Sequence, residues 1–61
     1  MPNMLTTKEA ALMSDLLAYE EAATKKARLY SRTLTNPKLA EKFGKLADNH
    51  EKRFNALYSM L

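Results

Sequence analysis

The sequence predicts an all-α fold, in which two long helices form an antiparallel hairpin and two hairpins associate into a four-helix bundle. The first observation is a break at residues 34–38, where Asn36 precedes Pro37. Proline has no backbone N–H, belongs in the first turn of a helix, and keeps the preceding residue out of the α region. The second observation is that a long amphipathic pattern lies on each side of this break. A connection this short joins antiparallel neighbours.

The first helix is expected over about residues 7–34. Thr6 and Glu9 have the spacing of a capping box, in which each side chain bonds the backbone N–H of the other residue. No glycine or proline interrupts the stretch that follows. Its apolar stripe advances three or four residues at a time, which is the spacing of one helix face. The stripe consists of Met13, Leu16, Ala23, Ala27, Tyr30 and Leu34.

The second helix is expected over about residues 37–60, with Asn36 as its N-cap. Gly44 is its one internal irregularity and costs about 1 kcal/mol relative to alanine. Together with Ala40 and Ala47, this glycine forms a strip of small residues that would let a facing helix approach closely. The apolar stripe of this helix consists of Leu39, Phe43, Leu46, Ala47, Phe54, Leu57 and Leu61.

A single domain spanning residues 1–61 is expected, and a chain of this size buries only about 60% of its unfolded surface. It has no cysteine, so neither a disulfide nor a thiolate metal site is expected. Nothing in the chain covers the apolar face of the hairpin, so we expect a homodimer or a larger homo-oligomer. The expected dimer core is Met13, Leu16, Ala23, Ala27, Tyr30, Phe43, Leu46, Ala47, Phe54 and Leu57.

Two polar residues, Glu20 and His50, occupy the apolar stripes where core residues belong. They are almost equally far from the turn, so an antiparallel hairpin brings them level. One interpretation is a buried hydrogen bond that fixes register and partner choice. A second is a site for iron, manganese or zinc, since carboxylate metalloproteins build such sites inside bundles. A third is a rotated stripe that leaves Glu20 or Glu21 in water.

The metal interpretation is weakened by the number of ligands. A full site would need a glutamate one turn before His50, where the chain has Ala47. Asp48 and Glu51 point away from the His50 face of the helix. Docking with the loops at opposite ends would bring two Glu20–His50 pairs together near the bundle centre. We favour this docking because loops at the same end would bring like charges together.

The net charge of +3 is concentrated near the turn, and a solvated basic surface is the favoured interpretation. A weak nucleic-acid or anionic-surface binder is the alternative, but no nucleic-acid partner is expected. The cations between residues 25 and 45 are Lys25, Lys26, Arg28, Arg32, Lys38, Lys42 and Lys45.

No enzyme activity, catalytic residue or cofactor is expected. The serines have no histidine in reach at helical spacing, and one glycine is too few for a phosphate-binding loop. The start of the chain lacks the basic region and apolar run of a secretory signal. No apolar segment approaches the ~20 residues that span a bilayer. We therefore expect a cytoplasmic protein without a membrane span.

Four segments stand in a characteristic order and spacing: Leu12 to Leu17, Tyr19-Glu20-Glu21, Asn36-Pro37-Lys38-Leu39, and His50 followed by Phe54 and Leu57. Over about residues 5–61 the chain thereby resembles the spore coat protein F-like family, which is placed with the ferritin-like helical proteins. The resemblance implies a ferritin-like four-helix bundle, an origin in a spore-forming bacterium, and the spore coat as an alternative location.

The same resemblance bears on metal binding. Ferritin-like proteins with metal use a glutamate on the first helix and Glu-x-x-His on the second. Glu20 (or Glu21) and His50 match two of these three positions, and Ala47 does not match the third. The resemblance therefore implies a non-enzymatic structural or assembly role, with reduced metal binding at Glu20 and His50 as the alternative.

Overall fold

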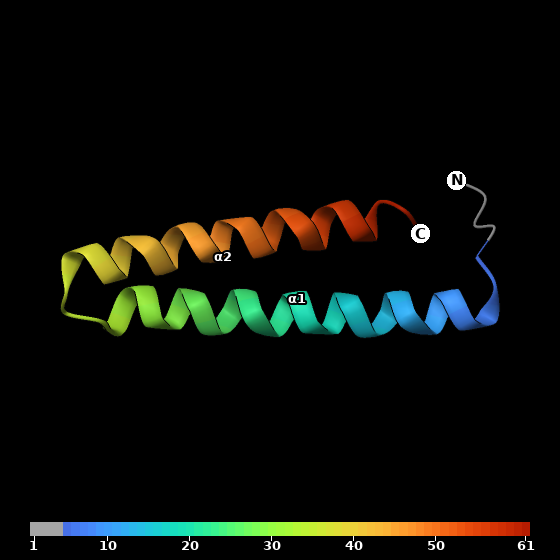
Figure 1. The fold of residues 1–61 in the computed structure, drawn as a ribbon, viewed down its shortest axis with the longest axis horizontal. Helices are drawn as coiled ribbons and strands as arrows, with labels where there is room; N and C mark the ends of the chain where they lie inside the picture. Colours follow the sequence, from blue (N-terminus) through green and yellow to red (C-terminus); the bar gives the residue numbers. More distant parts are fainter. Residues whose placement is uncertain (1–4) are drawn as a thin grey trace.

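The computed structural model describes residues 5–61, and these form two helices, α1 (Thr7–Thr33) and α2 (Pro37–Tyr58), with no strand among them. The helices lie side by side and antiparallel, and the turn that joins them is at the end opposite the C-terminus (Figure 1). This arrangement confirms the predicted helical hairpin. The hairpin measures 45 × 17 × 10 Å, so its thinnest dimension is that of one helix. Within residues 5–61 the two helices form a single layer.

The beginning of α1 is the predicted capping box. The Glu9 N–H donates to Thr6 Oγ1 at 3.1 Å, and the Thr6 N–H donates to Glu9 Oε1 at 3.0 Å. The helix ends at Thr33, one residue before the predicted end. Leu34 has extended backbone angles, φ −71° and ψ 133°, although its N–H still donates to the Tyr30 carbonyl. The chain has to leave the α region here in order to enter the turn.

The beginning of α2 also agrees with the prediction from the sequence. Asn36 is its N-cap, with Oδ1 accepting from the Leu39 N–H at 3.1 Å, and Pro37 is the first helical residue. The helix ends at Tyr58, two residues before the predicted end. The Met60 N–H donates to the Leu57 carbonyl three residues back, which is the hydrogen bond of a tight turn and not of an α-helix. The final turn therefore tightens beyond Tyr58.

The two helices contact each other along a line of small residues. Ala27 and Ala47 are buried, at 4% and 0% exposure. A Cβ atom added at Gly44 would lie 3.9 Å from the Cβ of Ser31 on the facing helix, which is ordinary van der Waals contact, so this position also has room for alanine. No large side chain of residues 5–61 is fully buried. The hairpin by itself therefore lacks a core of bulky apolar side chains. Within the same residues, neither helix is long and apolar enough to cross a membrane.

Candidate functional site

Glu20 and His50 are the two buried polar side chains of the described residues, at 6% and 8% exposure. Glu20 lies on the α1 line that contains Ala27, and His50 lies one turn after Ala47 on α2, so both point into the contact between the helices. Small neighbours on each helix bring the two backbones close enough for these longer side chains to meet. The burial of Glu20 excludes the rotated stripe that would leave this residue in water.

The two side chains form a hydrogen bond. His50 Nδ1 lies 2.6 Å from Glu20 Oε1. Because an ionised carboxylate only accepts, the proton is on Nδ1, and imidazole donates to carboxylate. A bond to an ionised partner is roughly twice as strong as a neutral one. The sequence interpretation of a buried pair that links the two helices is thereby confirmed.

Three neighbours complete the surroundings of this pair. The Tyr19 ring meets the imidazole edge to face, with centroids 6.2 Å apart and planes at 81°. The Thr24 hydroxyl donates to the Glu20 backbone carbonyl at 2.7 Å. Arg53 Nη1 lies 3.5 Å from His50 Nδ1, and since Nδ1 already donates to Glu20, this contact is electrostatic.

The pair lies beneath a broad apolar surface. On one side of the hairpin a small groove of about 160 Å³ exposes almost only apolar atoms, and His50 forms part of its wall with Ala23, Ala27, Tyr30, Phe43 and Leu46. We call this side the apolar face. Tyr30 and Phe43 pack edge to face across it, with centroids 5.5 Å apart. Exposed large apolar residues of the hairpin include Leu12, Leu16, Tyr19, Tyr30, Leu39 and Leu46, at 40–60% exposure.

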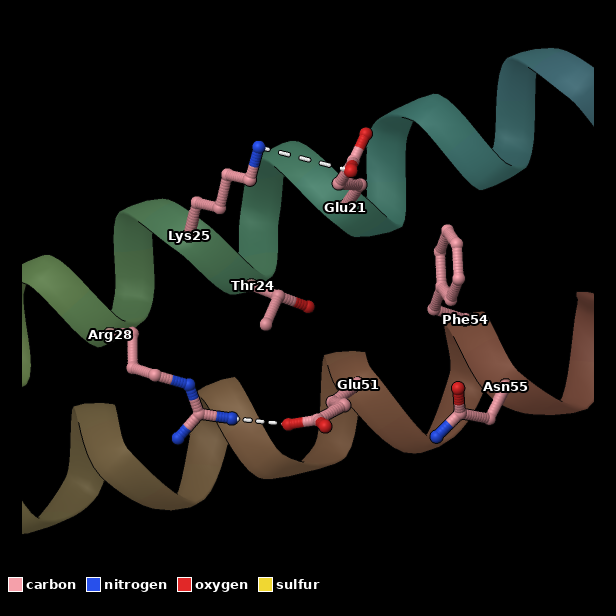
Figure 2. A pocket seen from close by; sticks show the side chains of 7 residues that line it. All are labelled: Glu21, Thr24, Lys25, Arg28, Glu51, Phe54 and Asn55. Atoms are coloured by element: carbon pink, nitrogen blue, oxygen red, sulfur yellow. Dashed lines mark hydrogen bonds and ion pairs between the residues drawn. The ribbon is translucent and has the colours of Figure 1, made fainter.

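The opposite side of the hairpin is polar and carries a shallow groove of about 360 Å³ (Figure 2). Arg28 reaches from α1 to two carboxylates of α2: Nη1 lies 3.3 Å from Asp48 Oδ1, and Nη2 bonds Glu51. Glu21 and Lys25 form a more distant pair of 3.8 Å along α1. Each charged residue that lines this groove has an ion-pair partner within the hairpin.

The Arg28 bridge was not predicted from the sequence. Asp48 and Glu51 point away from His50 as predicted, but no partner was predicted for them. Their spacing of three residues, which puts both on one helix face, is the signal that could have found them. The partner is harder to predict, because the long arginine side chain reaches well beyond the residues level with it.

The residues expected in the dimer core fall into three groups. Two are buried between the helices, namely Ala27 and Ala47. Five are half-buried: Met13, Ala23, Phe43, Phe54 and Leu57. Three are exposed: Leu16, Tyr30 and Leu46. Phe54 also lines the polar groove, where its ring stands between the helices (Figure 2).

The described residues of one hairpin offer few ligands for a metal ion. Residues 5–61 contain no group of three or more His, Cys, Asp or Glu side chains arranged to hold one. Glu20 and His50 are bonded to each other, and two donors fall short of the four that zinc takes. The position of a third ligand is held by Ala47, whose exposure of 0% leaves no room for a glutamate.

The cations near the turn are partly neutralised. Lys25, Arg28 and Lys45 each pair with a carboxylate of the hairpin. The cations near the turn without an ion pair in the described part of the chain are Lys26, Arg32, Lys38 and Lys42.

Comparison of the chain with protein-family models, with curated proteins and with solved structures gave no match.

Proposed function

We propose that this chain is a non-enzymatic structural or assembly protein, which acts as a homodimer or larger homo-oligomer. In this proposal the apolar faces of two hairpins pack together and complete a ferritin-like four-helix bundle. The Glu20–His50 hydrogen bond sets the register of the two helices within each hairpin. The resemblance to the spore coat F-like family supports the spore coat as a location, with the cytoplasm as the alternative.

The apolar face is the observation that carries the proposal. Leucine and tyrosine side chains on it remain 40–60% exposed, and a shallow apolar groove runs between them. Burying one leucine fully is worth about 1.5–3 kcal/mol, so several such side chains supply a large driving force for association. A stable domain buries its apolar stripes between at least two layers, and this hairpin is one layer.

The alternative of reduced metal binding at Glu20 and His50 has less support. One polar atom of each side chain is already hydrogen-bonded to the other side chain. The described residues of a hairpin offer no third ligand beside them. The proposed structural role needs no ion.

A pair of leucine substitutions tests the proposal. Leu46 lies on the apolar face and is 40% exposed, whereas Leu29 is 50% exposed and lies two residues from the buried Ala27, about 200° round α1. We expect Leu46→Lys to shift sedimentation from dimer to monomer, because a charge would have to be buried. Leu29→Lys makes the same chemical change on the outer surface and leaves the dimer intact. Equal behaviour of the two variants would overturn the proposal.

A further inference from the structure

One row of residues on α1 has features of a self-complementary contact. Asp15, Tyr19, Ala22 and Lys26 follow one another at helical spacing along the edge of the apolar face. Tyr19, Ala22, Ala23 and Lys26 line a shallow hollow of about 300 Å³. Tyr19, which lines this hollow, is 60% exposed.

The two charges in this row have no ion pair among residues 5–61, unlike Lys25, Arg28 and Lys45. Asp15 and Lys26 are about three helical turns apart, too far to reach each other within one chain. An acidic and a basic residue therefore stand at the two ends of this row, Lys26 at the hollow and Asp15 one turn beyond Tyr19, and neither has an ion pair among the described residues.

The row is symmetric about a single point. Asp15 and Lys26 are equally far from the midpoint between Glu20 and Glu21, and so are Tyr19 and Ala22. When two copies of α1 run antiparallel about a two-fold axis through this point, Asp15 of each lies level with the partner's Lys26. Tyr19 of each lies level with the hollow beside the partner's Ala22. Because the axis is two-fold, the Asp15–Lys26 match and the Tyr19–Ala22 match each occur twice in the dimer.

Four large apolar residues of α2 are placed symmetrically about His50. Phe43 and Leu57 are equally far from it, and so are Leu46 and Phe54. His50 is at the level of Glu20, because their side chains are bonded at 2.6 Å. One two-fold axis at this level therefore serves both helices, with α1 on the partner's α1 and α2 on the partner's α2.

We propose that two copies dock through their apolar faces with their turns at opposite ends, held in register by two reciprocal Asp15–Lys26 ion pairs. This inference rests on the proposed self-association and specifies its geometry. Docking with the turns at the same end would lay α1 on the partner's α2. Lys26, which is level with Phe43 and Leu46 in its own hairpin, would then lie close to the partner's Lys42. Like charges would meet there in place of opposite ones.

Charge reversal tests the ion pairs. Lys26→Asp would face the partner's Asp15, and we expect the dimer Kd to rise about fivefold or more at low salt. Asp15→Lys has the same effect, and the two changes combined restore the Kd to within about twofold. The control Lys25→Asp makes the same charge change at a residue that lines the polar groove and leaves the Kd within about twofold. A lower Kd for Lys26→Asp, as expected for relief of repulsion from Lys42, would overturn the docking.

A distance measurement tests the orientation directly. The chain has no cysteine, so Thr35→Cys places a single spin label in the exposed turn. Turns at opposite ends put the two labels of a dimer apart by a distance close to the 45 Å length of the hairpin. A distance below about 20 Å, two helix diameters, would overturn the inference and leave the dimer standing. Light scattering on the same labelled sample separates this outcome from a monomer, which would overturn the proposed function as well.

Discussion

The substitution His50→Ala removes the hydrogen-bond donor of the buried Glu20 carboxylate. Glu20 is 6% exposed, and the imidazole is the side-chain group that donates to its carboxylate in the hairpin. Leaving a buried carboxylate without its hydrogen-bond donor costs about 3 kcal/mol or more per protomer. A chain of this length is stable by only about 3–9 kcal/mol, at roughly 0.05–0.15 kcal/mol per residue. His50→Ala is therefore expected to lose most of its stability.

If the His50→Ala protein does not fold, a milder substitution still allows the contribution of the Glu20–His50 bond to stability to be measured. Glu20→Gln retains an acceptor for the Nδ1 proton but has no charge, so we expect a loss of about 1 kcal/mol, the difference between a charged and a neutral hydrogen bond. Replacing both Glu20 and His50 by leucine removes both polar groups, and recovers much of the loss caused by His50→Ala.

Urea unfolding followed by far-UV circular dichroism measures these differences. All variants are compared at one protein concentration, because the stability of a dimer depends on it. The control is Glu21→Gln, whose side chain is 59% exposed in a pair with Lys25, and a change below about 0.5 kcal/mol is expected. If His50→Ala cost no more than this control, the Glu20–His50 bond would have no role in holding the helices together.

Two further predictions concern the contact between the helices. Gly44→Ala raises the unfolding free energy by about 0.5–1 kcal/mol, because the added Cβ meets Ser31 Cβ at an ordinary 3.9 Å and alanine favours the helix; a lower urea midpoint would contradict this. Arg28→Met costs up to about 1 kcal/mol at low salt, because the side chain bridging to Asp48 and Glu51 is 37% exposed. That loss shrinks in 1 M salt, and a loss independent of salt would refute an electrostatic role.

The parts of this fold that are encoded locally could be predicted from the sequence. The turn follows from Asn36 before Pro37, and the first cap follows from the spacing of Thr6 and Glu9. Their hydrogen bonds join residues three apart, so no tertiary contact is needed to specify them. The Glu20–His50 bond could be predicted because a short turn fixes which residues lie level.

The rotation of each helix about its own axis could not be predicted from the sequence. Leu46 and Ala47 belong to one apolar stripe, yet the alanine is fully buried and the leucine is 40% exposed. Small residues occupy the contact between the helices because they let the two backbones approach closely. At this short separation the larger side chains lie at the sides of the contact. Periodicity identifies a helix face, but the sizes of residues on both helices decide which part of that face is used.

The most direct test of the account is the molar mass of the unmodified chain by light scattering, over a range of protein concentrations. The account predicts twice the chain mass of 7.0 kDa, or a higher multiple in a larger homo-oligomer. A folded, helical monomer at every concentration would contradict it, because the exposed apolar face would then need no second copy to cover it.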